Sequence, residues 1–272
     1  MRATEEEGNG MMHELIIERR ETAAWFTLNR EKEMNSLNPS LLDAIRAGVA
    51  NAIADENVRV MIFTGSGRAF CAGADLKFIE GLPEHVRNEA TAAFLFKATK
   101  VISAIAASPK PSIAAVNGIA VGGGLELLLA CDLIIAAREA MIGDGHANYG
   151  LFPGAGSTIR LPRRIGIGRA KQLLFTGELV TADRMAEFGL VNEVVEASEL
   201  CGKVQALAAH IATKSPIGIQ RMKQMVDLNF DMPQPAGLAM EQALADLHTT
   251  SFDMKEGLAA FRERRAPAFI GR

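Results

Sequence analysis

An α/β fold followed by a helical C-terminal region is predicted by three observations. Short apolar runs without polar alternation recur from residue 13 to about 195, which is typical of strands that are covered on both faces. Glycine-rich loops and helical patterns separate these runs. From residue 200 onward only helical periodicity remains. We therefore expect a disordered leader at residues 1–12, an α/β core at residues 13–199, and a helical oligomerisation region at residues 200–272.

The first elements of the core follow from apolar runs and the residues that interrupt them. Residues 13–29 hold two apolar runs on either side of the charged turn Arg19-Arg20-Glu21, which predicts a pair of strands. Asn38-Pro39-Ser40 is a helix-start signal, and apolar residues follow it at helical spacing. Residues 58–64 form a short apolar run that ends in Gly65-Ser66-Gly67, so they predict a buried strand.

The later elements are bounded by proline, glycine and charged residues. Apolar spacing predicts further helices at residues 84–107, 125–131, 169–174 and 181–188. Short apolar runs predict further strands at residues 112–116, 132–136 and 191–195. In the C-terminal region the same spacing predicts four helices, at residues 201–213, 216–228, 235–250 and 253–264.

Composition narrows the classes of function. The net charge is −3 and the chain has one Trp and one Tyr, so we expect no nucleic-acid partner and no acidic membrane surface. Cys71, Cys131 and Cys201 are widely spaced and odd in number, which argues against a disulfide framework and against a metal site. The chain has no apolar run long enough to span a membrane and no secretory signal pattern, so we expect a cytoplasmic protein.

Two loops carry the pattern of a chemical site. Residues 65–76 read GSGRAFCAGADL and residues 117–126 read NGIAVGGGLE, and each loop follows an expected buried strand. Small residues let backbone N–H groups approach a ligand closely, and the second loop runs into a helix whose first amides have no intrahelical partner. Two such amides on one carbonyl oxygen would form an oxyanion hole. The alternative interpretation is that these glycines only permit tight turns.

The order and spacing of four segments resemble the enoyl-CoA hydratase/isomerase (crotonase) family. These segments are SGRAFCAGADL, PSIAAVNGIAVGGGLELLLACDLIIAA, NYGLFPGAGSTIRLPRRIG and LLFTGELVTADRMAEFGLVNEVV. The resemblance extends over residues 13–265. It implies a crotonase-like spiral of ββα units, a homotrimer or a hexamer built from two trimers, and an acyl-CoA thioester as substrate. No cofactor is implied beyond the coenzyme A that is part of that substrate.

The resemblance also implies roles for individual residues. The backbone N–H groups of Ala74 and Gly123 would form the oxyanion hole. Neighbouring residues would line the path of coenzyme A and the acyl group, and the last helix would reach the ligand site of a neighbouring subunit. The substrate-binding residues implied in this way are Ala72, Asp75, Leu76, Lys77, Gly122 and Phe261.

The acid–base groups are expected near the start of the second loop's helix. Glu126 matches one of the two catalytic glutamates of the hydratases that this chain resembles. The second glutamate would fall at position 146, which is a histidine here. His146 can exchange protons near neutral pH, and Asp144 is an alternative base. If this segment is extended, Asp144 and His146 point to the same side and could act as a pair, but His146 could also be a lining residue without a proton role.

The leading hypothesis is therefore an enoyl-CoA hydratase, a lyase that adds water across a 2-enoyl-CoA. Isomerisation, decarboxylation, thioester hydrolysis and C–C cleavage would use the same oxyanion hole, so they stay open as alternatives. A non-catalytic RNA-binding relative of the fold is a third hypothesis, which the net charge disfavours. A serine peptidase is a weaker hypothesis still, because no Ser–His–Asp set can be assigned to the glycine-rich loops.

Overall fold

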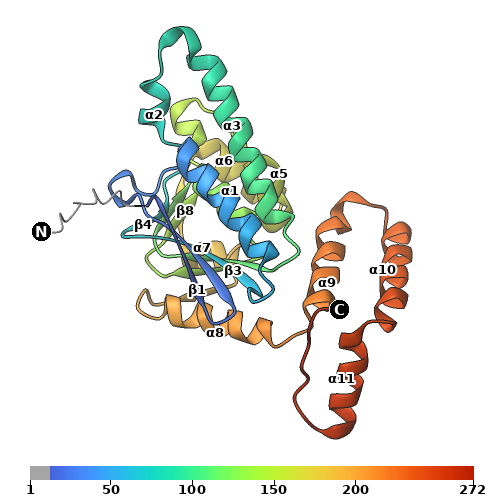
Figure 1. The fold of residues 1–272 in the computed structure, drawn as a ribbon. Coiled ribbons are helices and arrows are strands. Elements are labelled where there is room, and N and C mark those ends of the chain that lie inside the picture. The colour runs from blue at the N-terminus through green and yellow to red at the C-terminus, as the bar shows by residue number, and fades with distance from the viewer. Residues whose placement is uncertain (1–12) are drawn as a thin grey trace, which may run out of the picture.

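The computed structural model describes residues 13–272, so the leader predicted at residues 1–12 lies outside the described residues. Figure 1 shows an α/β body and a separate group of C-terminal helices. A six-stranded sheet runs through the body. All neighbouring strands in it are parallel except for the antiparallel pair β1–β2. In spatial order, the strands are β1 (Leu15–Arg20), β2 (Ala23–Leu28), β3 (Val60–Gly65), β5 (Ser112–Val116), β7 (Leu133–Ala137) and β10 (Glu193–Val195).

A second, four-stranded sheet consists of three-residue strands that the apolar pattern did not predict. These strands, in spatial order, are β4 (Ala69–Cys71), β6 (Ile119–Val121), β8 (Met141–Gly143) and β9 (Leu179–Thr181). The chain passes from the first sheet to the second three times, at β3–β4, β5–β6 and β7–β8, and helical structure follows each passage. This repeat is the spiral of ββα units that the resemblance implied.

Five of the seven helices in the described body lie close to predicted positions, whereas the two at residues 76–80 and 157–165 were not predicted. The seven helices are α1 (Pro39–Ala54), α2 (Leu76–Glu80), α3 (Glu84–Ala106), α4 (Gly123–Leu129), α5 (Ser157–Ile165), α6 (Ile167–Thr176) and α7 (Ala182–Glu187), with the 3₁₀ turns η1 (Glu31–Glu33) and η2 (His146–Tyr149). Asn38 caps α1, because its side-chain oxygen accepts a hydrogen bond from the Leu41 amide at 2.7 Å. Helix α4 starts two residues earlier than predicted, and this shift matters for the site.

The six-stranded sheet is covered on both faces, which explains why its strands lack polar alternation. On one face Phe26 and Phe63 stack with their ring centroids 4.8 Å apart, within the main cluster of buried residues. On the other face Trp25 and Ile62 belong to a second cluster that includes Val204 from α8 (Leu200–Ala212). The prediction of strands buried on both faces is therefore confirmed.

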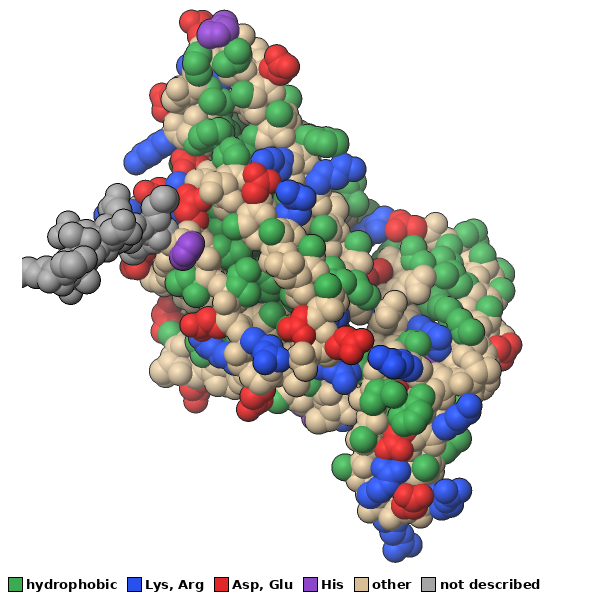
Figure 2. All heavy atoms as spheres, viewed as in Figure 1, with side chains coloured by type: hydrophobic (Ala, Val, Ile, Leu, Met, Phe, Trp, Pro, Cys, Tyr) green, Lys and Arg blue, Asp and Glu red, His purple; other side chains and the backbone are tan. Residues whose placement is uncertain are grey.

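The helical region predicted from residue 200 has two parts. Helix α8 packs on the six-stranded sheet, whereas a C-terminal lobe stands apart from the body (Figure 1). The lobe consists of α9 (Pro216–Leu228), η3 (Asn229–Asp231), α10 (Gln234–Thr249) and α11 (Phe252–Glu263). Neither α9 nor α10 buries a residue against the described part of the chain, and Figure 2 shows apolar side chains on the lobe's surface. Within residues 13–272, no helix has the length and apolar character needed to cross a membrane.

Candidate active site

The two predicted loops meet at their glycines. A Cβ placed on Gly123 would lie 3.5 Å from the Gly73 Cα and 3.6 Å from the Ala74 nitrogen. Gly73 has a φ of +93° and Gly122 has a φ of +57°, a backbone region that residues with side chains rarely adopt. The small residues at these positions therefore allow the two backbones to come into contact, which brings together the two predicted oxyanion donors, Ala74 and Gly123.

Both amides are held in place and remain available to a ligand. The peptides around Ala74 are fixed by Leu37, whose N–H donates to the Gly73 carbonyl at 2.7 Å and whose carbonyl accepts from the Asp75 N–H at 2.9 Å. Gly123 is the first residue of α4, where a helix leaves its N–H groups without intrahelical partners. Among residues 13–272, neither the Ala74 nor the Gly123 N–H donates a hydrogen bond. This arrangement suits an incoming carbonyl oxygen that gains negative charge.

Glu126 lies in the first turn of α4 and is 3 % exposed. Its Oε1 accepts hydrogen bonds from the backbone amides of Ala155, at 2.6 Å, and Ser157, at 3.2 Å. Burial raises the pKa of the Glu126 carboxyl, and the two amides and the charge of His146 offset only part of that rise. Glu126 is therefore a buried carboxyl group whose pKa is displaced toward neutrality, as suits a group that exchanges protons.

His146 and Asp144 form a hydrogen-bonded pair. The His146 Nδ1 lies 2.8 Å from Asp144 Oδ1, and the same oxygen accepts the His146 backbone N–H at 3.2 Å. The segment is not extended, contrary to the condition we set for this pair, because Gly145 adopts a φ of +71° and His146 begins η2. The turn at Gly145 brings Asp144 and His146 together, which an extended backbone was expected to do. With Nδ1 bonded to Asp144, Nε2 is the ring nitrogen left for another partner.

Asp144 changes the protonation of His146. Burial acts to lower the pKa of the imidazole, but the hydrogen bond and charge of Asp144, together with the charge of Glu126, outweigh it and raise the pKa above its usual value. Asp144 itself is 1 % exposed, and its Oδ2 has no hydrogen-bond partner within residues 13–272. The pair thus places a readily protonated imidazole over a buried carboxylate.

The predicted acid–base groups and the predicted oxyanion donors surround one glycine, Gly122. The Glu126 N–H donates to the Gly122 carbonyl at 3.0 Å. A Cβ placed on Gly122 would lie 3.6 Å from the Cε1 of His146 and 3.5 Å from the carbonyl oxygen of Asp144. The site therefore combines two hydrogen-bond donors for an oxyanion with a carboxyl group and an imidazole that can transfer protons.

The predicted substrate-binding residues fall into two groups. Ala72, Leu76 and Lys77 flank the Ala74 amide, and Leu76 and Lys77 are exposed, so both side chains are accessible to a ligand. Phe261 is 85 % exposed on α11, in the lobe that stands apart from the body (Figure 1), so the single chain does not bring it to the site. Its predicted contact, which requires a neighbouring subunit, stays a prediction.

The Asp75 carboxylate is occupied within the chain. It accepts from Arg30 Nη2 at 2.8 Å and caps α2 by accepting the Phe78 N–H at 3.1 Å. Burial acts to raise the pKa of Asp75, but the bonds from Arg30 and Phe78 outweigh it and lower the pKa. The carboxylate thus anchors the loop that carries Ala74. The Asp75 N–H and carbonyl are bonded as well, to Leu37 and Ile79, so the contact of Asp75 with substrate stays a prediction.

Residue-level reasoning missed the groups that hold Glu126. The amides of Ala155 and Ser157 come from the PGAGS segment, which entered the prediction only as part of a resemblance. The available signal was Gly156 directly before a helix, because helix N-termini offer free amides to carboxylates. No cluster of three or more His, Cys, Asp or Glu side chains within residues 13–272 could hold a metal ion.

Comparison with known proteins agrees with this geometry. The model of the enoyl-CoA hydratase/isomerase family matches residues 18–272. Crotonyl-CoA hydratase from Syntrophomonas wolfei is 38 % identical over 95 % of this chain and 98 % of its own length. 2,3-Dehydroadipyl-CoA hydratase from Escherichia coli is 35 % identical over 96 % of this chain and 100 % of its own length.

Solved structures give the same result. The crystal structure of an enoyl-CoA hydratase from Bacillus anthracis superposes with a TM-score of 0.91 at 38 % identity, covering 95 % of this chain and 100 % of that one. An enoyl-CoA hydratase from Mycobacterium smegmatis superposes with a TM-score of 0.88 at 32 % identity, covering 94 % and 98 %. The sequence and the spiral fold both match those of known members, so the chain belongs to the enoyl-CoA hydratase/isomerase family.

Proposed function

We propose that this enzyme adds water across the double bond of a 2-enoyl-CoA thioester. The observation that carries the proposal is the meeting of the Ala74 and Gly123 amides, which donate no hydrogen bond within residues 13–272, beside the buried Glu126 and the Asp144–His146 pair. The names of similar relatives support it, since several are hydratases of unsaturated acyl-CoA thioesters.

The reaction starts with the thioester carbonyl in the oxyanion hole. Hydrogen bonds from Ala74 and Gly123 draw electrons toward the carbonyl oxygen, so the β-carbon becomes electrophilic. Glu126, as a carboxylate, takes a proton from a water molecule while the water oxygen bonds to the β-carbon. The electrons of the double bond move to the thioester oxygen, and the resulting enolate is stabilised by the same two amides.

His146 completes the reaction by protonating the α-carbon. Asp144 favours the imidazolium form, so His146 can donate the proton from Nε2 as the enolate collapses. Glu126 then returns its proton to His146, and the net change is one water molecule added to one double bond. The reaction needs only the thioester and water, so we propose no further cofactor.

Isomerisation is the second candidate, and the histidine at position 146 is the observation that favours it. A single proton carrier suffices to move a double bond, so Glu126 alone could transfer the proton between two carbons over the same oxyanion hole. The conjugated enoyl thioester absorbs in the ultraviolet, which separates the two reactions. Hydration of crotonyl-CoA removes this absorbance, whereas isomerisation of a 3-enoyl-CoA creates it.

The decisive experiment measures both absorbance changes with the wild type and with Glu126→Gln. We expect loss of absorbance with crotonyl-CoA, no gain with 3-hexenoyl-CoA, and a fall in kcat of about 100- to 10,000-fold in the variant. Substrate binding by the variant, measured by calorimetry, should remain close to that of the wild type. A gain of absorbance with the 3-enoyl substrate alone would favour isomerisation, and an unchanged kcat in the variant would rule out the role of Glu126.

We further propose that the enzyme works as a trimer or a hexamer in the cytoplasm. The absence of buried residues on α9 and α10, within the described chain, supports a partner subunit that covers these helices. In such an assembly Phe261 of one subunit would meet the coenzyme A that passes Leu76 and Lys77 of another. Some similar relatives are named as mitochondrial, so cell fractionation is the test of location.

A further inference from the structure

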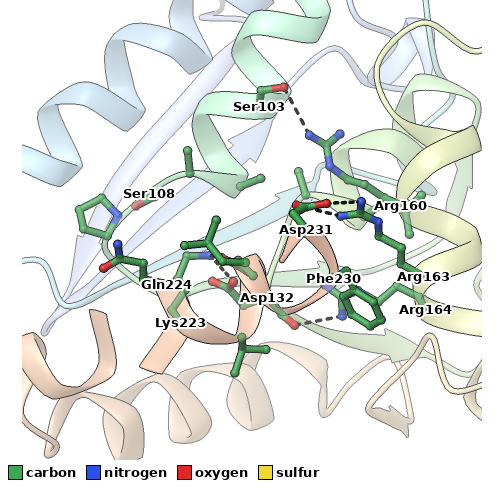
Figure 3. Close-up of a pocket in the computed structure, with 18 of the residues that line it drawn as sticks. Ser103, Ser108, Asp132, Arg160, Arg163, Arg164, Lys223, Gln224, Phe230 and Asp231 are labelled. Atoms are coloured by element: carbon green, nitrogen blue, oxygen red, sulfur yellow. Dashed lines mark hydrogen bonds and ion pairs between the residues drawn. The ribbon is translucent and has the colours of Figure 1, made fainter. Parts of the chain in front are cut away.

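Arg160 lies behind the candidate active site, and the proposed reaction does not use its side chain. It projects from α5 into a cavity of about 830 Å³ between the body and the C-terminal lobe, where it points toward Ser103 of α3 (Figure 3). Arg163 and Arg164, from the same helix, line the same cavity. Of these three arginines, Arg160 is the one that contacts the loop that holds Glu126.

A single residue, Ala155, connects Arg160 to Glu126. Arg160 Nη1 donates a hydrogen bond to the Ala155 carbonyl at 2.6 Å, and its Nη2 lies 3.3 Å from Ser103 Oγ. The Ala155 N–H, on the preceding peptide bond of the same residue, donates to Glu126 Oε1 at 2.6 Å. Because both polar groups of Ala155 are engaged, the guanidinium fixes the orientation of the residue that directs an N–H at the carboxylate.

The loop is shaped so that the guanidinium can reach its carbonyl. Gly156 has a φ of +127°, and a Cβ at this position would lie 2.1 Å from Arg160 Nη1. A side chain there would displace the guanidinium from the Ala155 carbonyl. The glycine thus serves the contact with Arg160 and allows the turn that leads into α5.

We propose that Arg160 is a positioning residue that holds the Ala155 backbone against Glu126 and thereby keeps the Glu126 carboxylate ionised and directed at the substrate. The inference rests on the acid–base role of Glu126 in the proposed function. The guanidinium acts through hydrogen bonds and through its charge, since Glu126 and Arg160 also attract each other electrostatically.

The effect of Arg160 on the pKa of Glu126 can be separated from the effects of the other titratable groups near Glu126. Asp144 and His146 approach it from the β8–η2 segment and act on its pKa in opposite directions. Strand β4 contributes Cys71, whose pKa burial raises to about 12, so the thiol stays neutral across the working range. Strand β6 has no titratable side chain. Loss of Arg160 removes a nearby positive charge and the bond that orients Ala155 toward the carboxylate, so the pKa of Glu126 should rise further.

Arg164 provides the matched control. It lies on the same helix, lines the same cavity, and also donates to backbone carbonyls, those of Cys131 at 2.7 Å and Asp132 at 3.2 Å. These contacts are with the segment between α4 and β7 and not with the loop at Ala155. Arg164→Met therefore reports what the loss of a cavity arginine does to the fold, without loss of the connection to Glu126.

The kinetic test compares Arg160→Met, Arg160→Lys and Arg164→Met in the full-length enzyme with crotonyl-CoA across the pH range. For Arg160→Met we expect kcat to fall about 10- to 100-fold with KM nearly unchanged, and the acidic limb of the kcat/KM profile to move to higher pH. Arg160→Lys keeps the charge, so its acidic limb should stay closer to that of the wild type. Arg164→Met should keep the wild-type limb. An acidic limb that is the same in all four proteins would overturn the inference.

A direct titration keeps the test independent of activity and of the methionine variant. The carboxyl signal of Glu126, assigned in ¹³C NMR spectra by its absence from Glu126→Gln, is followed against pH in the wild type, Arg160→Lys and Arg164→Met. We expect a higher midpoint in Arg160→Lys, which loses the planar two-nitrogen contact, than in Arg164→Met. Equal midpoints would reject the role of Arg160 even if the enzyme proves to be an active hydratase. A shifted midpoint in an enzyme without hydratase activity would instead reject the proposed reaction.

Discussion

The Glu126 carboxyl occupies a site that disfavours its charge. It is buried, and its pKa is raised chiefly by that burial. A carboxyl group whose folded pKa lies above its unfolded value, about 4.3, stabilises the fold below that unfolded value and loses this contribution as the pH rises through the folded pKa. At neutral pH an ionised Glu126 therefore lowers the stability of the fold.

Glu126→Gln should consequently stabilise the protein at about pH 8 while it abolishes turnover. We expect a gain of about 0.5–2 kcal/mol in the free energy of unfolding at that pH, and a smaller gain at about pH 4, where the wild-type carboxyl is protonated as well. Urea unfolding at both values measures the difference. Glu80→Gln, at the exposed end of α2, is the control and should change stability by less than about 0.5 kcal/mol. Destabilisation by Glu126→Gln at pH 8 would show that the two amides outweigh burial.

The Asp144–His146 pair predicts a different dependence on pH. The folded pKa of His146 is raised, so its contribution to stability is complete below the unfolded value of about 6.5 and is lost as the pH rises through the folded pKa. The free energy of unfolding of the wild type should exceed that of His146→Asn by more at about pH 5.5 than at about pH 8.5. Chemical denaturation at the two values checks this, and an equal difference at both would mean that Asp144 does not bind the imidazolium preferentially.

At this scale the sequence predicted which residues matter better than it predicted how they are held. The spacing of Asp144 and His146 indicated a pair, but the structure forms it around a left-handed Gly145 and not along extended backbone. The amides of Ala155 and Ser157 could not be assigned to Glu126 in advance. They approach it from about 30 residues away, and only the packing of α5 against α4 defines that approach.

Helix α4 depends on a close backbone contact at its first turn. A Cβ at Gly124 would lie 2.0 Å from the Cys71 carbonyl oxygen and 3.0 Å from the Cys71 Cβ, so only glycine fits between α4 and β4. This contact sets the position of both loops that carry the predicted oxyanion donors. A change at Gly124 should therefore affect both the stability of the fold and the geometry of the site.

Gly124→Ala should separate the two loops. We expect a loss of about 2–4 kcal/mol in the free energy of unfolding, together with a loss of crotonyl-CoA turnover, because α4 must move away from β4. Gly202→Ala is the control, since Gly202 lies in α8 with no atom within 4 Å of the added Cβ; it should be neutral or stabilising by up to about 1 kcal/mol. Thermal unfolding of both variants gives the comparison. Equal melting temperatures for the two would contradict the crowding at Gly124.

Element prediction succeeded where residues are organised locally. The four predicted C-terminal helices and the strands of the six-stranded sheet all occur near their expected positions. The second sheet was missed completely. Its strands have three residues each, too few for an apolar period, and β4 and β6 lie inside the glycine-rich loops. These segments become strands because they form hydrogen bonds with segments that are distant in the chain.

The C-terminal lobe exposes apolar side chains that the described part of the chain does not cover. On α9, Met222 is 62 % exposed and Val226 is 69 % exposed. An apolar face of this kind is typical of a subunit interface. The exposed apolar residues of α9 are therefore the place to test the proposed assembly.

Val226→Glu should weaken the proposed assembly. We expect the wild type to elute at a multiple of the 29.1 kDa subunit mass in size-exclusion chromatography with light scattering, and the variant to shift toward a single subunit. Asn51→Glu, which adds the same charge to the exposed face of α1, should leave the mass unchanged. If both variants have the mass of the wild type, α9 does not form the interface at Val226.

For the whole molecule, the sequence by itself determined the α/β class, the helical C-terminal region, the two glycine-rich loops and Glu126 as the carboxyl beside them. Each of these features depends on a short segment, because apolar spacing, helix caps and glycine act on the backbone near them. Only the tertiary structure decided that Ala74 and Gly123 lie together with amides that donate no hydrogen bond within residues 13–272. It also decided that Glu126 is held by the segment that Arg160 contacts, and that Asp144 bonds to His146. Each of these depends on where two separate backbones meet or turn, because the direction of a hydrogen bond is set by the packing of both partners and not by the identity of either one.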